Sequence, residues 1–412
     1  MQRNANPTLR PVRAWLARCG AAALLALVTA CGGGGGGGTA SSTTTDTTPP
    51  IAAGTNVTPL VVDRGFDGTS INSPYVSVEV CAPGTATCQT IDHVLVDTGS
   101  YGLRVLAGAL TVALPTVAAP GGAPLGECAS FVSGFAWGSV RTADVQIAGE
   151  KAAAVPVQIV NDPAPAYATV PTACNNTGAS MGVGSGAKGI LGVGFLAQDC
   201  GATCVNTAAA NMYFQCAANG TGCTTTAVPL ASQVTNPATL FATDNNGVVI
   251  RLPDIGASGA SVVRGELAFG IGTQANNALG SAQVFTADAN GTITTVYKGT
   301  TLRGFLDSGS NGLFFHDTTI PLCGGGSGFY CPVRTLSLTA TVTGANGATR
   351  SVPFEVQNPN ALPAGTAAAK LGGDLGLTRS FDWGLPFYFG RTVFSAFSGA
   401  STPKGPGPYY AF

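Results

Sequence analysis

Charged side chains are scarce in this chain: Asp, Glu, Lys and Arg make up 9% of its 412 residues. Basic and acidic residues nearly cancel, with 19 of the first kind and 20 of the second. Nucleic-acid binding needs a clustered basic face, so the sequence predicts no nucleic-acid partner. Histidine occurs only at His93 and His316, so few residues could serve as the base of a Ser-His-Asp triad.

Helical periodicity and long hydrophobic runs are also scarce. Apolar residues account for 45% of the chain, and small uncharged residues supply much of the rest. This composition favours β-structure with many turns. Segments that alternate apolar and polar residues or are rich in β-formers predict strands, and Pro156 predicts an edge or a bulge in one of them. The predicted strands lie at 75–80, 145–147, 155–160, 247–253, 265–270, 335–342, 352–356 and 383–394.

The first thirty residues have the pattern of an export signal. An Arg-bearing start without acidic residues leads into an apolar run, 21–30, which is too short to span a bilayer as a stable helix. We therefore expect a signal peptide over residues 1–30. The run ends in Leu-Val-Thr-Ala-Cys, which resembles a bacterial lipobox and predicts lipidation of Cys31. The alternative is an ordinary signal that is cleaved near Ala30.

A glycine run and a Ser/Thr run follow Cys31 and contain no apolar residues to bury. We expect residues 31–57 to be a flexible tether between a lipid anchor and the folded body. The residue after Cys31 is Gly32 rather than Asp, which favours the outer membrane of a bacterial cell envelope, on its periplasmic or surface face.

The cysteines support an oxidising compartment. Ten of the twelve remain once Cys19 and Cys31 are set aside, and an even number in an exported chain predicts up to five disulfides. Short spacings favour local pairs: Cys81 with Cys88, Cys216 with Cys223, and Cys323 with Cys331. A zinc site is the alternative, and it would use Cys200, Cys204, Cys216 and Cys223.

One motif occurs twice. The first copy reads Val-Leu-Val-Asp-Thr-Gly-Ser-Tyr-Gly-Leu over 94–103, and the second reads Gly-Phe-Leu-Asp-Ser-Gly-Ser-Asn-Gly-Leu over 304–313. Two copies predict two lobes, 58–235 and 236–412, each offering one carboxylate to a shared site. The alternative is that Asp97 and Asp307 are turn residues in a duplicated barrel, because Asp and Gly are natural turn formers.

A pair of carboxylates has a specific chemistry. Two such groups at about 3 Å cannot both ionise cheaply, so one keeps a proton and the pair titrates as a unit. The ionised partner can activate a water while the protonated one polarises a carbonyl group. Gly99 and Gly309 would let the two backbones approach closely, because glycine has no Cβ atom. This chemistry requires no metal and no organic cofactor.

With these motifs, the chain resembles the pepsin-like aspartic peptidases over about residues 58–400. The resemblance implies an all-β, bilobal fold with two six-stranded-type β-barrels and an interlobe cleft. Residues 190–192, Ile-Leu-Gly, resemble the hydrophobic loop beside the first aspartate, and Trp383-Gly384 is a looser candidate for the second loop. Together with the lipobox and the tether, the chain resembles an uncharacterised family of bacterial pepsin-like lipoproteins.

The resemblance also assigns roles to the residues of the two motifs. Thr98 and Ser308 would link each loop to the opposite backbone, and Ser100 and Ser310 would donate to the outer carboxylate oxygens. The family usually carries a Tyr on a hairpin that covers the cleft, but residues 131–139 contain none. Phe131 and Trp137 are the remaining candidates for closing the cleft.

The sequence thus predicts an aspartic endopeptidase, with Asp97 and Asp307 as catalytic residues acting on extended polypeptides. The alternative is a non-catalytic envelope lipoprotein that binds a polypeptide or a glycan in the same cleft. We expect a monomer. A glycosidase also needs two carboxylates, but it does not need the duplicated context. His93 is expected to be structural, His316 to lie on a loop, and Asp374 to form a turn.

Overall fold

The computed structural model describes residues 49–175, 179–180, 186–208, 211–363, 365 and 367–412. These described residues belong to one compact unit. The predictions for the signal peptide, for Cys31 and for most of the tether lie outside the described residues. Among those that are described, no helix has the length and apolar character needed to cross a membrane.

Strands joined by turns make up nearly all of the regular structure, which confirms the expected scarcity of helix. In the part of the chain that the structure describes, the α-helices are α1 (Thr172–Asn175) and α2 (Ala202–Asn206), and both are short. The strands that precede residue 236 are β1 (Val57–Asp63), β2 (Ser73–Cys81), β3 (Cys88–Asp97), β4 (Tyr101–Leu106), β5 (Leu125–Phe131), β6 (Gly134–Ile147), β7 (Glu150–Val160), β8 (Ala179–Ser180), β9 (Gly189–Val193), β10 (Tyr213–Cys216) and β11 (Cys223–Thr225). The later strands are β12 (Gly247–Leu252), β13 (Val263–Phe269), β14 (Val284–Thr286), β15 (Ile293–Tyr297), β16 (Thr300–Leu306), β17 (Leu313–Phe314), β18 (Leu336–Thr343), β19 (Thr349–Val356), β20 (Gly372–Gly373), β21 (Ser380–Trp383), β22 (Arg391–Ala396), β23 (Ser401–Thr402), β24 (Gly405–Pro406) and β25 (Tyr409–Ala411).

The strand β2 has the alternation that the sequence predicts. Val76, Val78 and Val80 are buried, whereas Ser77 between them is exposed. Strand β7, which contains Pro156, lies between β6 and β4 rather than at an edge. Pairing with β4 begins only at Gln158, so no β4 residue pairs with the proline. The strand is therefore interior and not at an edge, but the bulge alternative is supported, because the β6–β7 register shifts between Ala143 and Val145, next to the pair of Thr142 with Pro156.

A closed barrel of six strands forms the first half of the body. Its strands follow the order β6, β7, β4, β9, β3 and β2, and a second pairing between β2 and β6 closes it. Val94, Val96 and Leu191, from the strands next to the first aspartate, are fully buried in its core. The end of β3 is therefore anchored by packing on both sides.

A seven-stranded sheet dominates the second half, in the order β19, β18, β15, β16, β21, β17 and β20. Its core contains stacked aromatic rings: the ring centroids of Phe315 and Phe381 lie 4.9 Å apart, and those of Phe381 and Trp383 lie 4.2 Å apart. Phe381 and Trp383 belong to β21, so this packing fixes the strand next to the second aspartate.

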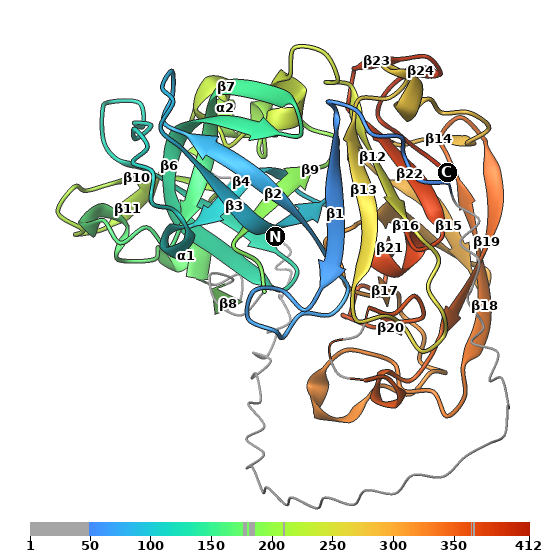
Figure 1. The fold of residues 1–412 in the computed structure, drawn as a ribbon. Helices are drawn as coiled ribbons and strands as arrows, with labels where there is room; N and C mark the ends of the chain where they lie inside the picture. Colours follow the sequence, from blue (N-terminus) through green and yellow to red (C-terminus); the bar gives the residue numbers. More distant parts are fainter. Residues whose placement is uncertain (1–48, 176–178, 181–185, 209–210, 364, 366) are drawn as a thin grey trace, which may run out of the picture. The chain divides into compact units, whose positions relative to one another are not determined.

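A continuous sheet also joins the two halves. Strand β1 pairs antiparallel with β13, and β12, β22, β25 and β14 follow beyond it. Figure 1 shows β1, in blue, beside β13, in yellow. The sequence had assigned β1 to the first lobe and could not reveal this long-range pairing. The predicted all-β architecture with two lobes is confirmed.

The packed body begins earlier than the sequence suggested. Asn56 lies in the segment that was expected to be a tether, yet it is fully buried and its side-chain nitrogen donates to the Phe269 carbonyl oxygen at 2.8 Å. Ile51 also packs against a buried apolar cluster of the second half. The end of the expected tether is thus corrected, because these residues pack instead of being solvated.

Five disulfides are present. The three predicted local pairs, Cys81–Cys88, Cys216–Cys223 and Cys323–Cys331, are all formed. The other two are Cys128–Cys174 and Cys200–Cys204. The alternative of a zinc site is wrong, because all four of its cysteines are in disulfides and none offers a thiolate.

Candidate active site

Asp97 lies at the end of β3, beside β9. The two strands run parallel, with Val96 opposite Leu191 and Asp97 opposite Gly192. A Cβ atom on Gly192 would lie 2.6 Å from the backbone nitrogen of Tyr101. Only glycine therefore lets the chain beyond Asp97 turn so close to β9.

Asp307 follows β16 in an equivalent arrangement beside β21. Leu306 lies opposite Trp383 in a parallel pair, and the Asp307 N–H donates to the Trp383 carbonyl oxygen at 3.1 Å. Gly384 then takes the place that Gly192 has in the first half, and a Cβ atom on it would lie 2.1 Å from the Gly312 carbonyl oxygen. Trp383-Gly384, the looser candidate for the second hydrophobic loop, thus lies beside Asp307 as residues 190–192 lie beside Asp97.

The two motif loops approach each other face to face. A Cβ atom on Gly99 would lie 2.7 Å from the Asp307 carboxyl carbon, and one on Gly309 would lie 2.7 Å from that of Asp97. The two carboxyl groups also share a hydrogen bond. The structure therefore brings Asp97 and Asp307 together, and both glycines are needed for the approach.

Reciprocal hydrogen bonds hold the loops together. The Thr98 hydroxyl accepts from the Ser308 N–H at 2.9 Å and donates to the Leu306 carbonyl oxygen at 3.0 Å. The Ser308 hydroxyl accepts from the Thr98 N–H at 3.1 Å and donates to the Val96 carbonyl oxygen at 2.7 Å. Thr98 is 6% exposed and Ser308 is fully buried. Buried, reciprocal bonds of this kind fix the distance between the two carboxyl groups.

Replacing Thr98 with valine should lower the free energy of unfolding by about 2 kcal/mol, because the buried Ser308 N–H loses its acceptor while the side-chain volume is kept. Urea unfolding followed by fluorescence would measure the loss. The Thr98→Ser variant keeps the hydroxyl and is the matched control. Equal stability of the valine and serine variants would show that these bonds do not hold the loops.

Each carboxylate has two donors within its own motif. In the first copy, Asp97 Oδ1 accepts from the Gly99 N–H at 2.8 Å and Oδ2 accepts from the Ser100 hydroxyl at 2.5 Å. In the second, Asp307 Oδ1 accepts from the Gly309 N–H at 2.8 Å, and Oδ2 accepts from the hydroxyl of the next serine at 2.9 Å. The two aspartates are thus oriented in the same way.

One proton is retained by the pair. Burial raises the pKa of the Asp307 carboxyl well above its usual range, and the nearby charges of Asp97 and Asp382 raise it further. The Ser310 hydroxyl acts in the opposite direction, but it does not reverse the shift. Because two adjacent carboxyls cannot both ionise cheaply, the pair titrates as a unit, and the raised pKa of Asp307 favours a proton on this member.

A hairpin of β5 and β6 contains both aromatic candidates for closing the cleft. Phe131 ends β5, and the Arg104 guanidinium carbon lies 5.8 Å from the centroid of its ring. Trp137 is only 2% exposed, and its indole nitrogen donates to the Tyr167 carbonyl oxygen at 2.9 Å. Phe131 therefore lies next to the turn of the hairpin, whereas Trp137 is part of the core and is not available to cover a substrate.

The structure adds two residues that the sequence did not single out. Tyr388 is fully buried, and its hydroxyl lies 3.0 Å from that of Thr98. Asp382 lies on β21, and burial raises the pKa of its carboxyl well above its usual range, while the nearby Ser310 hydroxyl acts in the opposite direction. A signal for Asp382 was available, since it stands two residues before Gly384, where the first copy has the apolar Ile190 before Gly192.

The remaining polar candidates have structural partners. His316 Nδ1 lies 2.7 Å from Asp374 Oδ2, and the other oxygen of Asp374 accepts from the Gly376 N–H, as a turn requires. His93 lies on β3 and contacts Asp92 at 2.8 Å. Glu79, Cys81 and Cys88 have the spacing of metal ligands, but both cysteines are in a disulfide and cannot serve as thiolate ligands.

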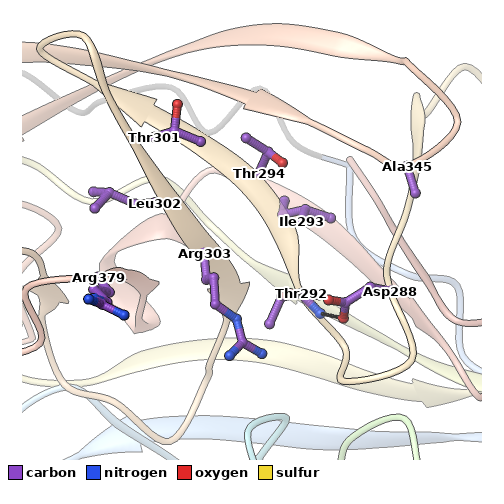
Figure 2. A pocket seen from close by; sticks show the side chains of 9 residues that line it. All are labelled: Asp288, Thr292, Ile293, Thr294, Thr301, Leu302, Arg303, Ala345 and Arg379. Carbon is purple, nitrogen blue, oxygen red and sulfur yellow. Dashed lines mark hydrogen bonds between the residues drawn. The ribbon is translucent and has the colours of Figure 1, made fainter.

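A pocket of about 560 Å³ lies away from this pair, against β15 and β16 (Figure 2). Its lining includes Arg303 and Arg379, whereas no residue of either Asp-Thr/Ser-Gly-Ser motif contributes. The candidate active site is therefore defined by the aspartates and not by this hollow.

Comparisons with known proteins agree with this geometry. A family model described as "Protein of unknown function (DUF3443)" matches residues 52–412. The chain belongs to this family. The solved structures similar to this DUF3443 chain include the crystal structure of an aspartic proteinase from Irpex lacteus, with 17% identity and a TM-score of 0.50. The match covers 86% of this chain and 96% of the proteinase chain, and it shows that this chain has a pepsin-like fold. No curated protein matches.

Proposed function

We propose that this protein is an aspartic endopeptidase, which hydrolyses peptide bonds with a water activated between Asp97 and Asp307. The observation that supports it most is the reciprocal bonding of Thr98 and Ser308, which holds the two carboxyls together. A duplicated turn without a joint function would not require each loop to bond to the backbone of the other. The fold of an aspartic proteinase is consistent with the proposal.

The proposed reaction uses the two aspartates in different protonation states. The Asp97 carboxylate takes a proton from the water, whose oxygen attacks the carbonyl carbon of the peptide. Asp307 transfers its proton to the carbonyl oxygen, which gives a neutral tetrahedral diol. Asp97 then gives its proton to the leaving nitrogen while the Asp307 carboxylate takes one from a diol hydroxyl, so that the C–N bond breaks to an acid and an amine and the pair returns to its starting state. The proposed reaction needs no electron acceptor and no metal ion.

A transition-state mimic tests the proposal. A statine-type peptide carries a hydroxyl where the tetrahedral diol forms, so a peptidase should bind it at least about 10²-fold tighter than the same peptide with an ordinary amide. Isothermal calorimetry on the purified protein would measure both affinities. Equal affinities would contradict the proposal. The Asp97→Ala variant is the control, because it should lose the preference for the mimic.

The hairpin supports a second candidate function. No Tyr lies in residues 131–139, and the aromatic residue next to the turn is Phe131, whose ring has no hydroxyl to donate to a bound peptide. A non-catalytic protein that holds a polypeptide or a glycan would not need that donor. The calorimetric comparison separates the two functions, because a binding protein should not prefer the mimic over the ordinary peptide.

We further propose that the protein acts as a monomer at the outer membrane of a bacterial envelope, anchored through a lipid on Cys31. The five disulfides are consistent with an oxidising compartment. Replacing Cys31 with alanine should move most of the protein from the membrane fraction to the soluble fraction, which immunoblotting of the two fractions would show. Membrane retention equal to wild type would count against the anchor.

A further inference from the structure

A third carboxyl group, that of Asp382, lies beside the aspartate pair. The residue is 3% exposed, and its Oδ1 atom has no hydrogen-bond partner. It lies opposite Phe305 of β16, whereas the first half has Ile190 opposite Leu95 in the matching position. A buried carboxyl with one unpartnered oxygen is costly, so its presence next to only one of the two aspartates calls for a reason.

The Ser310 hydroxyl connects Asp382 to Asp307. It donates to Asp307 Oδ2 at 2.9 Å, and it also interacts with the Asp382 carboxyl, whose pKa it lowers. A hydroxyl has a single proton, so it can donate to only one carboxylate at a time. A protonated Asp382 donates to Ser310, which then donates to Asp307. An ionised Asp382 instead competes with Asp307 for the Ser310 proton.

The surroundings of Asp382 contain no compensating positive charge. The titratable groups that face it are the carboxyls of Asp97 and Asp307 and the hydroxyls of Tyr388 and Tyr410. Within the described part of the chain, no Lys, Arg or His forms an ion pair with it. Each additional negative charge in this cluster therefore makes ionisation of Asp307 more costly.

We propose that Asp382 is a positioning residue, which acts through Ser310 to keep a proton on Asp307 and so extends peptide cleavage to higher pH. This inference rests on the proposed peptidase function. In its ionised form, Asp382 adds a negative charge and also withdraws the Ser310 donor. Both changes favour the protonated form of Asp307, which is the form that donates to the scissile carbonyl. The proton is thus lost at a higher pH than in a pair without Asp382.

The test uses a replacement that keeps the shape but cannot ionise. In Asp382→Asn, the pKa of Asp307 should fall by about one unit or more, measured by NMR titration of ¹³C-labelled aspartate. The alkaline limb of the pH profile of kcat/KM should move down by the same amount. In a Ser310→Ala background, Asp382→Asn should have a smaller effect, because only the through-space charge remains. Asp374→Asn is the control and should leave the Asp307 titration unchanged.

The outcomes are distinguishable. An Asp307 pKa that is the same in wild type and in Asp382→Asn overturns the inference, and it leaves the peptidase proposal intact if cleavage is observed. A lowered pKa in a protein that cleaves nothing supports the proton-holding role and overturns the peptidase proposal. If Asp382→Asn does not fold, Asp382→Ile decides, because isoleucine is the residue that the first half has at the matching position. The Asp307 pKa should fall in this variant as well, and an unchanged value overturns the inference.

Discussion

Replacing either Asp97 or Asp307 with asparagine should lower kcat/KM for a cleaved peptide by about 10⁴-fold. The first change removes the base that takes the proton of the water, and the second removes the acid that protonates the carbonyl oxygen. Both groups act on the same step, so the double variant should be little worse than either single one. A fluorogenic peptide and purified variants are enough for the measurement.

The Asp374→Asn variant is the matched control for this comparison. Asp374 also lies in the second half and also accepts a backbone N–H, but its partner is His316 and not the aspartate pair. Its kcat/KM should stay within about twofold of wild type, as is usual for a change outside the reacting groups. A loss of less than about tenfold for Asp97→Asn or Asp307→Asn would contradict the assignment of the pair.

The second large effect is expected at the two glycines of the motifs. A methyl group at Gly99 or Gly309 would lie 2.7 Å from the opposite carboxyl carbon, which is too close for an unmoved pair. That carboxyl is held by its own backbone and serine donors, so relief requires that the loops separate. Displacing catalytic groups by a few tenths of an ångström to one ångström should cost about 10²-fold in kcat/KM.

Gly108 provides the control for this experiment. A Cβ atom there would meet nothing within 4 Å, so Gly108→Ala tests the substitution without the clash. The free energy of unfolding should be measured for each variant, to separate a local displacement from loss of the fold. Wild-type kcat/KM in both Gly99→Ala and Gly309→Ala would mean that the carboxyls do not need their close approach.

Much of the site could be predicted from the sequence, because a short motif specifies it and that motif occurs twice. Within four residues, each motif supplies the aspartate, the glycine that permits the close approach of the two loops, and hydroxyl groups that hydrogen-bond. The duplication of the motif predicted a pair of carboxyl groups. The three local disulfides were also predictable, since short loops limit the possible partners. Local patterns of this kind need no knowledge of the tertiary structure.

Other features depend on contacts between distant segments, and the sequence did not reveal them. The pairing of β1 with β13 and the disulfide between Cys128 and Cys174 join residues far apart in the chain. In the sequence, Trp137 and Phe131 are equal candidates for closing the cleft, because both are aromatic. Only the packing of Trp137 shows that it belongs to the core. The sequence did not single out Asp382, because its importance depends on Ser310, which lies beside it only in the folded chain.

The most direct test of the proposed function is cleavage itself. The purified protein would be incubated with a denatured polypeptide between pH 3 and pH 8, and mass spectrometry would identify new chain ends. We predict internal cleavage that is strongest where the pair holds a single proton and that is absent in Asp97→Asn. Intact substrate across the whole range, in a protein that still binds the polypeptide, would contradict the peptidase proposal and favour the non-catalytic binding function.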